Sequence, residues 1–373
     1  MSDASTTRKY PPGTHPDMPP PLLESGAIYW VRKNLLSSWT NVGLTLAGLW
    51  ALWLIIPPFY EWAYADAVFN AADRSECQSL GDGACWAFIQ ERFKIFIFGF
   101  YPEAERWRTI LTFALLFVAI GPLLFDNFPY RGKAMLFSLA YPFVAAWLLL
   151  GGFGLTPVGT DEFGGMLLNL IVGITGITFS LPIGIVLALG RASNLPAVRI
   201  ICVTFIEFIR GVPLITLLFL ASTMLSYFLP PGTSFDLLMR VLIMVTLFAS
   251  GYLAEVVRGG LQAIPRGQYE AADSMGLKYW QSMRLIVLPQ ALKISIPGIV
   301  NTFIGLFKDT TLVIIIGLFD MLGMGRSSLA DAKWAGLSSE VYISIALFFF
   351  LFCFAMSRYS LYLESKLETG HRI

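Results

Sequence analysis

The stretch that decides the fold class lies between two long apolar runs and reads Glu270-Ala-Ala-Asp-Ser-Met-Gly276-Leu-Lys-Tyr-Trp-Gln-Ser-Met-Arg-Leu-Ile286-Val-Leu288-Pro289. It is not apolar enough to cross a membrane, and it predicts two short helices joined by a turn at Gly276, where a positive φ or a missing Cβ is useful. Pro289 is expected to stop this piece before the next apolar run. We call residues 266–289 the knob. The small and apolar residues of the knob favour contact with a partner protein, and an interfacial helix lying on lipid is the alternative.

The composition of the whole chain is that of a membrane protein. Of its 373 residues, 56% are hydrophobic and only 14% are charged, whereas soluble domains contain about 25% charged residues. The formal net charge of +1 gives no field that would attract polyanions. These values exclude a soluble globular enzyme, a disordered protein and a nucleic-acid binder. The predicted fold class is therefore an all-α polytopic membrane protein.

Eight apolar segments are long enough to cross a bilayer. The fifth and the seventh contain charges and helix breakers, so we expect each of them to tilt or break. The predicted spans are 42–59, 109–125, 134–153, 165–190, 200–228, 240–257, 291–318 and 341–361.

The distribution of Lys and Arg favours a cytoplasmic N-terminus and, with eight spans, a cytoplasmic C-terminus. The Pro-rich residues 1–41 are expected to be a disordered tail. The long loop 60–108 would then lie outside, where thiols oxidise. Its two cysteines, Cys77 and Cys85, form a candidate disulfide, and two unpaired thiols are the alternative.

Charged residues interrupt two of the predicted spans. Glu207 and Arg210 have i,i+3 spacing in the fifth span, just before Gly211-Val-Pro213. Charged side chains inside a membrane span line a cavity or pair with each other. Glu207 and Arg210 are therefore either part of a substrate path or an ion pair that stabilises the bend. The seventh span contains a second group with the same two alternatives, substrate contact or a helix cap: Lys308, Asp309, Thr310 and Thr311. Both histidines lie in the tails, so no metal site is expected inside the membrane.

The spacing within the knob resembles the EAA motif of ABC importer permeases. Glu270-Ala271-Ala272 is followed after three residues by Gly276, after nine more by Ile286, and then by Leu288-Pro289. Other segments resemble the polar amino acid branch of that family, of the histidine/glutamine permease type, so that the resemblance covers residues 164–365: Gly164–Asn169, Glu207–Leu214, Gly251–Gly260 and Phe307–Leu312. The first three spans, with Gly83-Ala-Cys85-Trp86-Ala-Phe88 in their loop, resemble the extended M subunit of general L-amino acid importers.

The resemblance implies a five-helix type I permease core over 164–365, preceded by a three-helix extension over 42–163 and followed by a cytoplasmic tail, 366–373. It also implies that a cytoplasmic coupling loop, 258–289, docks on a separate ATPase. The coupling residues would be those of the motif, Glu270, Ala271, Ala272, Gly276, Ile286, Leu288 and Pro289.

The implied function is the transmembrane permease subunit of an ATP-driven amino acid importer in the bacterial inner membrane. Its partners would be an ABC ATPase dimer, a second homologous permease subunit, a periplasmic amino acid-binding protein and the amino acid itself. The resemblance favours a heterodimer of the two permease subunits. The chain has no G-x-x-x-x-G-K-[S/T] segment. We therefore expect no cofactor on this chain and no enzyme activity, with ATP and Mg²⁺ bound by the partner ATPase.

Two other functions are compatible with a polytopic helical protein. An ion-driven secondary transporter would need coupling carboxylates near the midplane and no partner-binding knob, and the sequence has few buried acids. A membrane enzyme would need a nucleophile–base pair or a set of metal ligands at one membrane depth, and no such set is visible.

Overall fold

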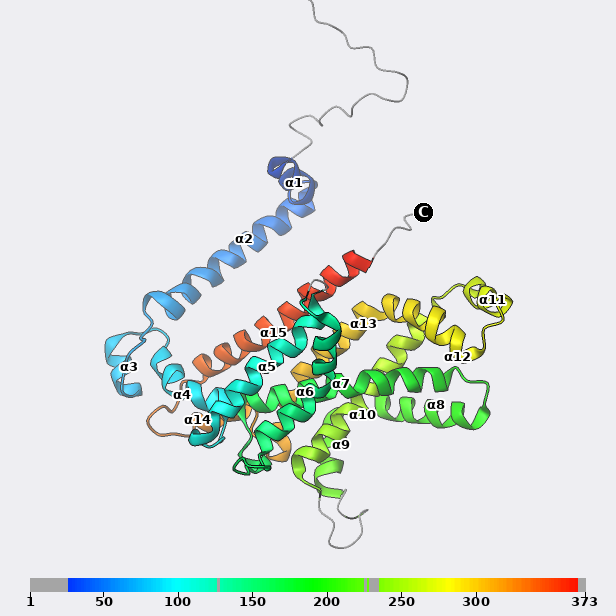
Figure 1. Cartoon of the computed structure of the whole chain (residues 1–373). Coiled ribbons are helices and arrows are strands. Elements are labelled where there is room, and N and C mark those ends of the chain that lie inside the picture. The colour runs from blue at the N-terminus through cyan, green and yellow to red at the C-terminus, as the bar shows by residue number, and fades with distance from the viewer. Residues whose placement is uncertain (1–25, 126–127, 225–226, 228–234, 368–373) are drawn as a thin grey trace, which may run out of the picture. The chain divides into compact units, whose positions relative to one another are not determined.

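The computed structural model describes residues 26–125, 128–224, 227 and 235–367, and no strand occurs among them. The chain divides into two compact units, Met1–Val68 with Ser79–Ala84 and Phe69–Gln78 with Cys85–Ile373. Figure 1 shows the helices and their labels. Of the two predicted tails, residues 1–25 and 368–373 lie outside the described residues, whereas part of the segment 1–41 is helical in α1.

The first unit is built from one long span. A short helix, α1 (Ala27–Asn34), precedes α2 (Trp39–Tyr60), which continues as the π-helical turn η1 (Glu61–Ala65). Ser38 caps α2 by accepting a hydrogen bond from the Asn41 N–H at 3.2 Å. No residue of α2 is buried within the chain, so its apolar side chains are left for lipid.

The second unit includes the last two membrane helices of the predicted extension, α5 and α6, and the shorter helices before them. Its first helices are α3 (Arg74–Leu80, of which Ser79 and Leu80 are counted with the first unit), α4 (Trp86–Phe98), η2 (Glu103–Glu105), α5 (Arg106–Leu124) and α6 (Arg131–Leu150). Helices α5 and α6 are joined by hydrogen bonds from Ser138 Oγ to the Ala119 carbonyl (2.6 Å) and from Tyr141 OH to the Thr112 carbonyl (3.0 Å). These bonds give two apolar helices a defined register.

The remaining helices form the core of this unit. In chain order they are η3 (Thr160–Glu162), α7 (Gly165–Arg191), α8 (Pro196–Gly211), α9 (Leu214–Phe219), η4 (Leu220–Met224), α10 (Leu237–Gln262), α11 (Arg266–Ser274), α12 (Tyr279–Ser282), η6 (Met283–Val287), α13 (Leu288–Asp309), η7 (Thr310–Ile316), α14 (Met321–Ser328) and α15 (Ser338–Leu367).

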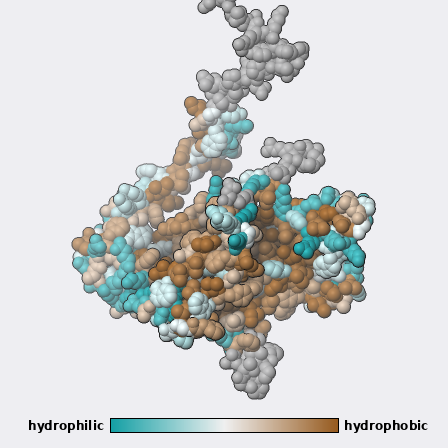
Figure 2. Space-filling view, in the orientation of Figure 1, coloured by the Kyte–Doolittle hydropathy of each residue, from teal (hydrophilic) through white to brown (hydrophobic). Residues whose placement is uncertain are grey.

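Small residues let the two central helices, α7 and α10, pack closely. A Cβ at Gly184 of α7 would lie 2.8 Å from the Leu253 Cβ and 3.1 Å from the Ser250 carbonyl of α10, which is the close approach expected of small residues between membrane helices. Figure 2 shows hydrophobic residues over the middle of the helices of this unit and hydrophilic residues near α4 and near α11.

Among the described residues, six helical segments are long and apolar enough to span a membrane, and a bent pair raises the number to seven. The pair is α8 with α9–η4, bent by 103° at Gly211-Val-Pro213, which confirms the predicted break in the fifth span. That predicted span, 200–228, also extends over residues 225–226 and 228, which lie outside the described residues. The predicted seventh span, 291–318, is also expected to tilt or break. It is contained almost entirely in one continuous 38-residue helical segment, Tyr279–Ile316. The predicted span 109–125 corresponds to α5, which is not among these seven, so a count of eight is compatible with the structure. The protein is polytopic and all-α.

Candidate functional site

The turn at Gly276 separates the two short helices of the knob, α11 and α12. Gly276 has φ +71°, and its N–H donates to the Asp273 carbonyl at 2.9 Å. A Cβ at this position would meet nothing within 4 Å. Glycine is therefore required here for its backbone conformation rather than for space, and the predicted turn is confirmed.

The knob divides its small residues between two surfaces. Ala272 is fully buried, whereas Glu270 and Ala271 are exposed, and so are the large side chains of Met275, Tyr279, Trp280 and Leu285. Ile286 and Leu288 are half-buried and Pro289 is exposed. An exposed apolar surface of this kind, next to the polar residues of α11, is typical of a protein-binding site.

The knob is tied to the spans on both sides. Met283 and Val287 lie in a buried cluster with Val257 and Leu261 of α10 and Ala291 of α13. Gln290 of α13 donates to the Gln268 side chain of α11 at 3.1 Å. A displacement of α11 would therefore be transmitted to α10 and α13.

The expectation that Pro289 stops the second short helix is wrong. The chain continues from α12 through the π-helical turn η6 into α13, with Pro289 in the first turn of α13. Proline is tolerated in a first turn because its missing N–H would have no partner inside the helix there.

A cluster of charges centred on Glu255 joins three helices near the knob end of α10. The Glu255 carboxylate lies 2.7 Å from Arg191 of α7, 3.7 Å from Arg210 of α8 and 2.8 Å from Arg258 of α10. Glu207 of α8 lies 2.8 Å from Arg191. Only 15% of the Glu255 side chain is exposed, against 55% for Glu207. Glu255 is the shared acceptor that holds these helix ends together.

The direct ion pair between Glu207 and Arg210, one of the two alternatives for these residues, does not form. Glu207 pairs with Arg191, and Arg210 pairs with Glu255 and lies 5.8 Å from the centre of the Tyr252 ring. The i,i+3 spacing allows contact on one helix face, but here the neighbouring helices supply closer partners. Glu255 and Arg258 have the same i,i+3 spacing, and they do form an ion pair as part of the larger cluster.

The four polar residues of the seventh span have different surroundings. Lys308 is exposed and Asp309 half-buried at the end of α13, and Thr311 donates to the Lys308 carbonyl at 2.9 Å. Thr310 is buried and accepts a hydrogen bond from Asn169 of α7 at 2.8 Å. The structure thus separates Thr310, which is used in packing, from the three residues beside it.

Asp320 is a buried carboxylate that the sequence patterns missed. It is fully buried at the start of α14, where its oxygens accept from the Gly323 N–H (2.9 Å) and from Asn169 (3.1 Å). The side-chain oxygen of Asn169, Oδ1, in turn accepts a hydrogen bond from the Met321 N–H at 2.9 Å. Burial raises the pKa of Asp320, and the hydrogen bonds oppose that rise. An Asp directly before a glycine-rich segment is an N-cap signal that could have revealed it.

Comparison with known proteins identifies the family. The family described as the binding-protein-dependent transport system inner membrane component matches residues 180–369. The chain is 50% identical over 359 residues to the Escherichia coli inner membrane amino-acid ABC transporter permease protein YhdY, covering 96% of this chain and 97% of that protein.

The chain belongs to this family of transport-system inner membrane components.

A second relative is similar over its full length. The Rhodobacter capsulatus glutamate/glutamine/aspartate/asparagine transport system permease protein BztC is 47% identical over 422 residues, covering 95% of this chain and 96% of that protein. One solved structure, described as an amino acid ABC transporter with histidines, covers 54% of this chain and 92% of its own at 28% identity and a TM-score of 0.49. Both full-length relatives are permease proteins of transport systems, so this chain is a permease subunit and not an enzyme.

The other end of the permease carries the disulfide. Cys77 and Cys85 are bonded, with their Cα atoms 5.9 Å apart. The Cys85 N–H donates to Glu340 of α15 at 3.2 Å, and Arg74 donates to the Ala335 carbonyl at 2.5 Å. Arg74 and Cys85 are thus fastened to the first turn of α15 and to the connection that precedes it.

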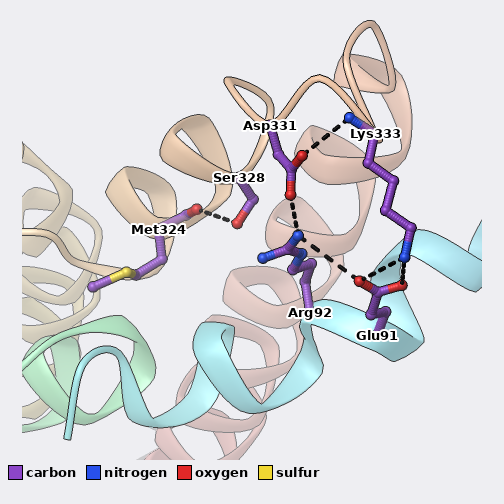
Figure 3. Close-up of polar contacts among 6 residues, drawn as sticks. All are labelled: Glu91, Arg92, Met324, Ser328, Asp331 and Lys333. Atoms are coloured by element: carbon purple, nitrogen blue, oxygen red, sulfur yellow. Dashed lines mark hydrogen bonds and ion pairs between the residues drawn. The ribbon is translucent and has the colours of Figure 1, made fainter. Parts of the chain in front are cut away.

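Two ion pairs also join α4 to the segment between α14 and α15, as Figure 3 shows. Arg92 pairs with Asp331, and Lys333 lies 3.1 Å from Glu91. Burial would raise the pKa of Glu91, but the hydrogen bond from Lys333 and the charges of Lys333 and Arg92 lower it overall. Among the described residues, no group of three or more His, Cys, Asp or Glu side chains could hold a metal ion.

Proposed function

We propose that this chain is the permease subunit of an ATP-driven, binding-protein-dependent importer of amino acids, with ATP hydrolysed on a separate subunit. The observation that carries the proposal is the knob, an exposed apolar surface anchored to the two spans that it connects. A partner that moves the knob would move α10 and α13 together, and this is a physical route to alternating access. The names of both full-length relatives support amino acids as the substrate class.

The proposal includes a definite set of partners. An ATPase dimer would bind the knob through Glu270, Ala271, Gly276, Ile286, Leu288 and Pro289, with Ala272 supporting them from inside. A second, homologous permease would complete the pathway as a heterodimer, and a binding protein would deliver substrate from the opposite side. Both termini would be cytoplasmic, with the disulfide outside the inner membrane. The core would extend over 164–365, with 42–163 as the extension and 258–289 as the coupling loop.

The candidate substrate path runs along the break in the fifth span and the end of α13. Lys308, Asp309 and Thr311 offer a cation, a carboxylate and a hydroxyl, which suit the carboxylate and ammonium groups of an amino acid. Glu207 and Arg210, as members of the Glu255 cluster, would lie beside this path. Thr310 would support the path through Asn169.

Exchanging Ala271 for Asp tests the proposal. Ala271 is exposed, so Ala271→Asp should leave the abundance of the complex unchanged. At a docked surface, an unpaired buried charge would reduce uptake into proteoliposomes by more than about tenfold. Stimulation of ATPase activity by the loaded binding protein should fall in parallel.

The matched control is Ala197→Asp, at a position that is also exposed, at the start of α8 and outside the knob. This variant should transport normally. Normal uptake by Ala271→Asp would refute the assignment of the knob as the coupling segment.

The proposed orientation is tested by the two cysteines of the disulfide. In intact spheroplasts, Cys77 and Cys85 should react with a membrane-impermeant maleimide only after an impermeant reductant is added. Labelling that requires permeabilised membranes, even after reduction, would reverse the orientation. Labelling of both thiols without reductant would show that the bond does not form in the cell.

A further inference from the structure

An apolar cavity of about 190 Å³ lies where α5 and α6 meet α7 and α10, helices that are labelled in Figure 1. Each of the four helices contributes hydrophobic side chains to its wall. Representative lining residues are Phe113, Leu116, Leu149, Leu167, Ile171 and Leu242. The cavity therefore lies at the seam between the last two helices of the extension and the core.

Along α7, the cavity is nearly as long as one lipid leaflet is thick. Its lining residues on α7 run from Leu167 to Thr175, which corresponds to about 12 Å at the rise of an α-helix. One half of a bilayer's hydrocarbon core is about 15 Å thick. Thr160 and Asp236, just before α7 and α10, line the cavity at the disulfide end.

Water and polar ligands find few partners in this space. Thr112 donates to the Arg108 carbonyl, Tyr141 to the Thr112 carbonyl and Thr160 to Asp236, so these hydroxyls are already engaged by the protein. A buried water needs two to four polar partners, and apolar cavities without them stay dry. A cavity of this size would destabilise the helix packing if it remained empty.

We propose that the acyl chain of a phospholipid, from the leaflet at the disulfide end, occupies this cavity and joins the extension to the core. An apolar cavity of about 150 Å³ holds one benzene molecule, so this one has room for a single stretch of hydrocarbon. An α-helix, with a diameter of about 10 Å, is too wide to enter it. The bilayer presents acyl chains at the depth of the cavity in any membrane that the permease spans. The proposal does not depend on the transported substrate.

Photocrosslinking tests this site in the complete transporter. Purified complex is reconstituted with a phospholipid that carries a diazirine on one acyl chain, illuminated, digested and mapped by mass spectrometry. The probe should label peptides that contain residues 141–150 and 167–175. A diazirine near the glycerol should mark the ends of these segments closest to Thr160, and one near the chain terminus should mark the region of Tyr141 and Thr175.

A filled cavity supplies the matched variant. Ala145 lines the cavity, and Ala145→Phe should reduce labelling of both segments by about tenfold, the factor for losing the burial of roughly two methylene groups. Ala140→Phe makes the same exchange at an exposed position of α6 outside the cavity and should leave the labelling unchanged.

Three outcomes would overturn the proposal. They are equal labelling of all lipid-facing helices, labelling that Ala145→Phe does not change, and labelling by a small apolar diazirine but not by the phospholipid. The depth dependence in the unmodified protein decides the question even if Ala145→Phe does not fold.

Discussion

Glu255 and Asp320 are both acids with little or no exposure in the core, at opposite ends of the spans, and the protein stabilises them by opposite means. Three guanidinium groups from three helices surround Glu255. Asp320 accepts hydrogen bonds from neutral donors, the Gly323 N–H and the Asn169 amide. Glu255 therefore depends on charges supplied by separate elements, which relative motion of the helices can change. Asp320 depends on groups of α14 itself and the first turns of α7, which form a fixed support.

The largest effect is expected when the charge of Glu255 is removed. Glu255→Gln leaves Arg191, Arg210 and Arg258 close together with one carboxylate, Glu207, remaining among them. Breaking a buried pair costs about 3–5 kcal/mol, and the partial exposure of the arginines places the expected loss near 3 kcal/mol. The melting temperature and abundance of the purified complex should fall, and uptake should fall with them.

Glu207→Gln is the matched control for that exchange. The Glu207 side chain is 55% exposed and pairs with Arg191 alone, so its removal should cost about 0–1 kcal/mol. An equal loss of stability in Glu255→Gln and Glu207→Gln would show that Glu255 is not the central acceptor of the cluster. The contrast between Glu255, held by charges, and Asp320, held by neutral donors, would then fail.

A smaller effect, with a defined pH dependence, is expected for Asp320→Asn. Asparagine caps a helix as well as aspartate does, but its amide N–H₂ cannot accept the hydrogen bond from Asn169, and this should cost about 1–3 kcal/mol. Because burial raises the pKa of Asp320 in the folded state, the folded protein binds more protons than the unfolded chain. The stability from this group is present below the ordinary Asp pKa and is lost as the pH rises through the raised value.

The difference in melting temperature between the parent protein and Asp320→Asn should therefore shrink as the pH rises. Asp236→Asn is the control, since Asp236 caps α10 in the same way, accepting from the Met239 N–H at 3.1 Å, but is exposed. A difference that grows with pH would mean that Asp320 is stabilised as the anion, like Glu255.

Sequence patterns predicted the spans and the knob for a physical reason. Apolar runs must be helical in lipid because each backbone N–H and C=O needs a partner, and Pro213 forces the break that separates α8 from α9. The same patterns mispaired Glu207. Its i,i+3 spacing to Arg210 is identical to that of Glu255 and Arg258, yet only the second pair forms, because Arg191 from α7 reaches Glu207.

Asp320 and the contacts at the disulfide end were missed for a related reason. Asn169 and Asp320 are 151 positions apart, and Arg92 and Asp331 are 239 apart. No local period links residues at such separations, and only the packing of α4, α7 and α14 brings them together. Resemblance to a family predicted the segments that we propose to meet a partner, whereas the internal contacts of the extension required coordinates.

The smallest effect is expected for the ion pair between Arg92 and Asp331, whose side chains are 21% and 37% exposed. A double-mutant cycle with Arg92→Ala and Asp331→Ala should give a coupling energy of about 0.2–1 kcal/mol, and added salt should reduce it. The Glu103–Arg106 pair, with Glu103 78% exposed, is the control and should show no measurable coupling. Charge pairing at this end would then be peripheral, with the fixed support coming from the Asp320 network. A coupling energy near that of Glu255, insensitive to salt, would show instead that both ends of the permease are held by desolvated charges, and the distinction between a fixed end and a movable end would no longer hold.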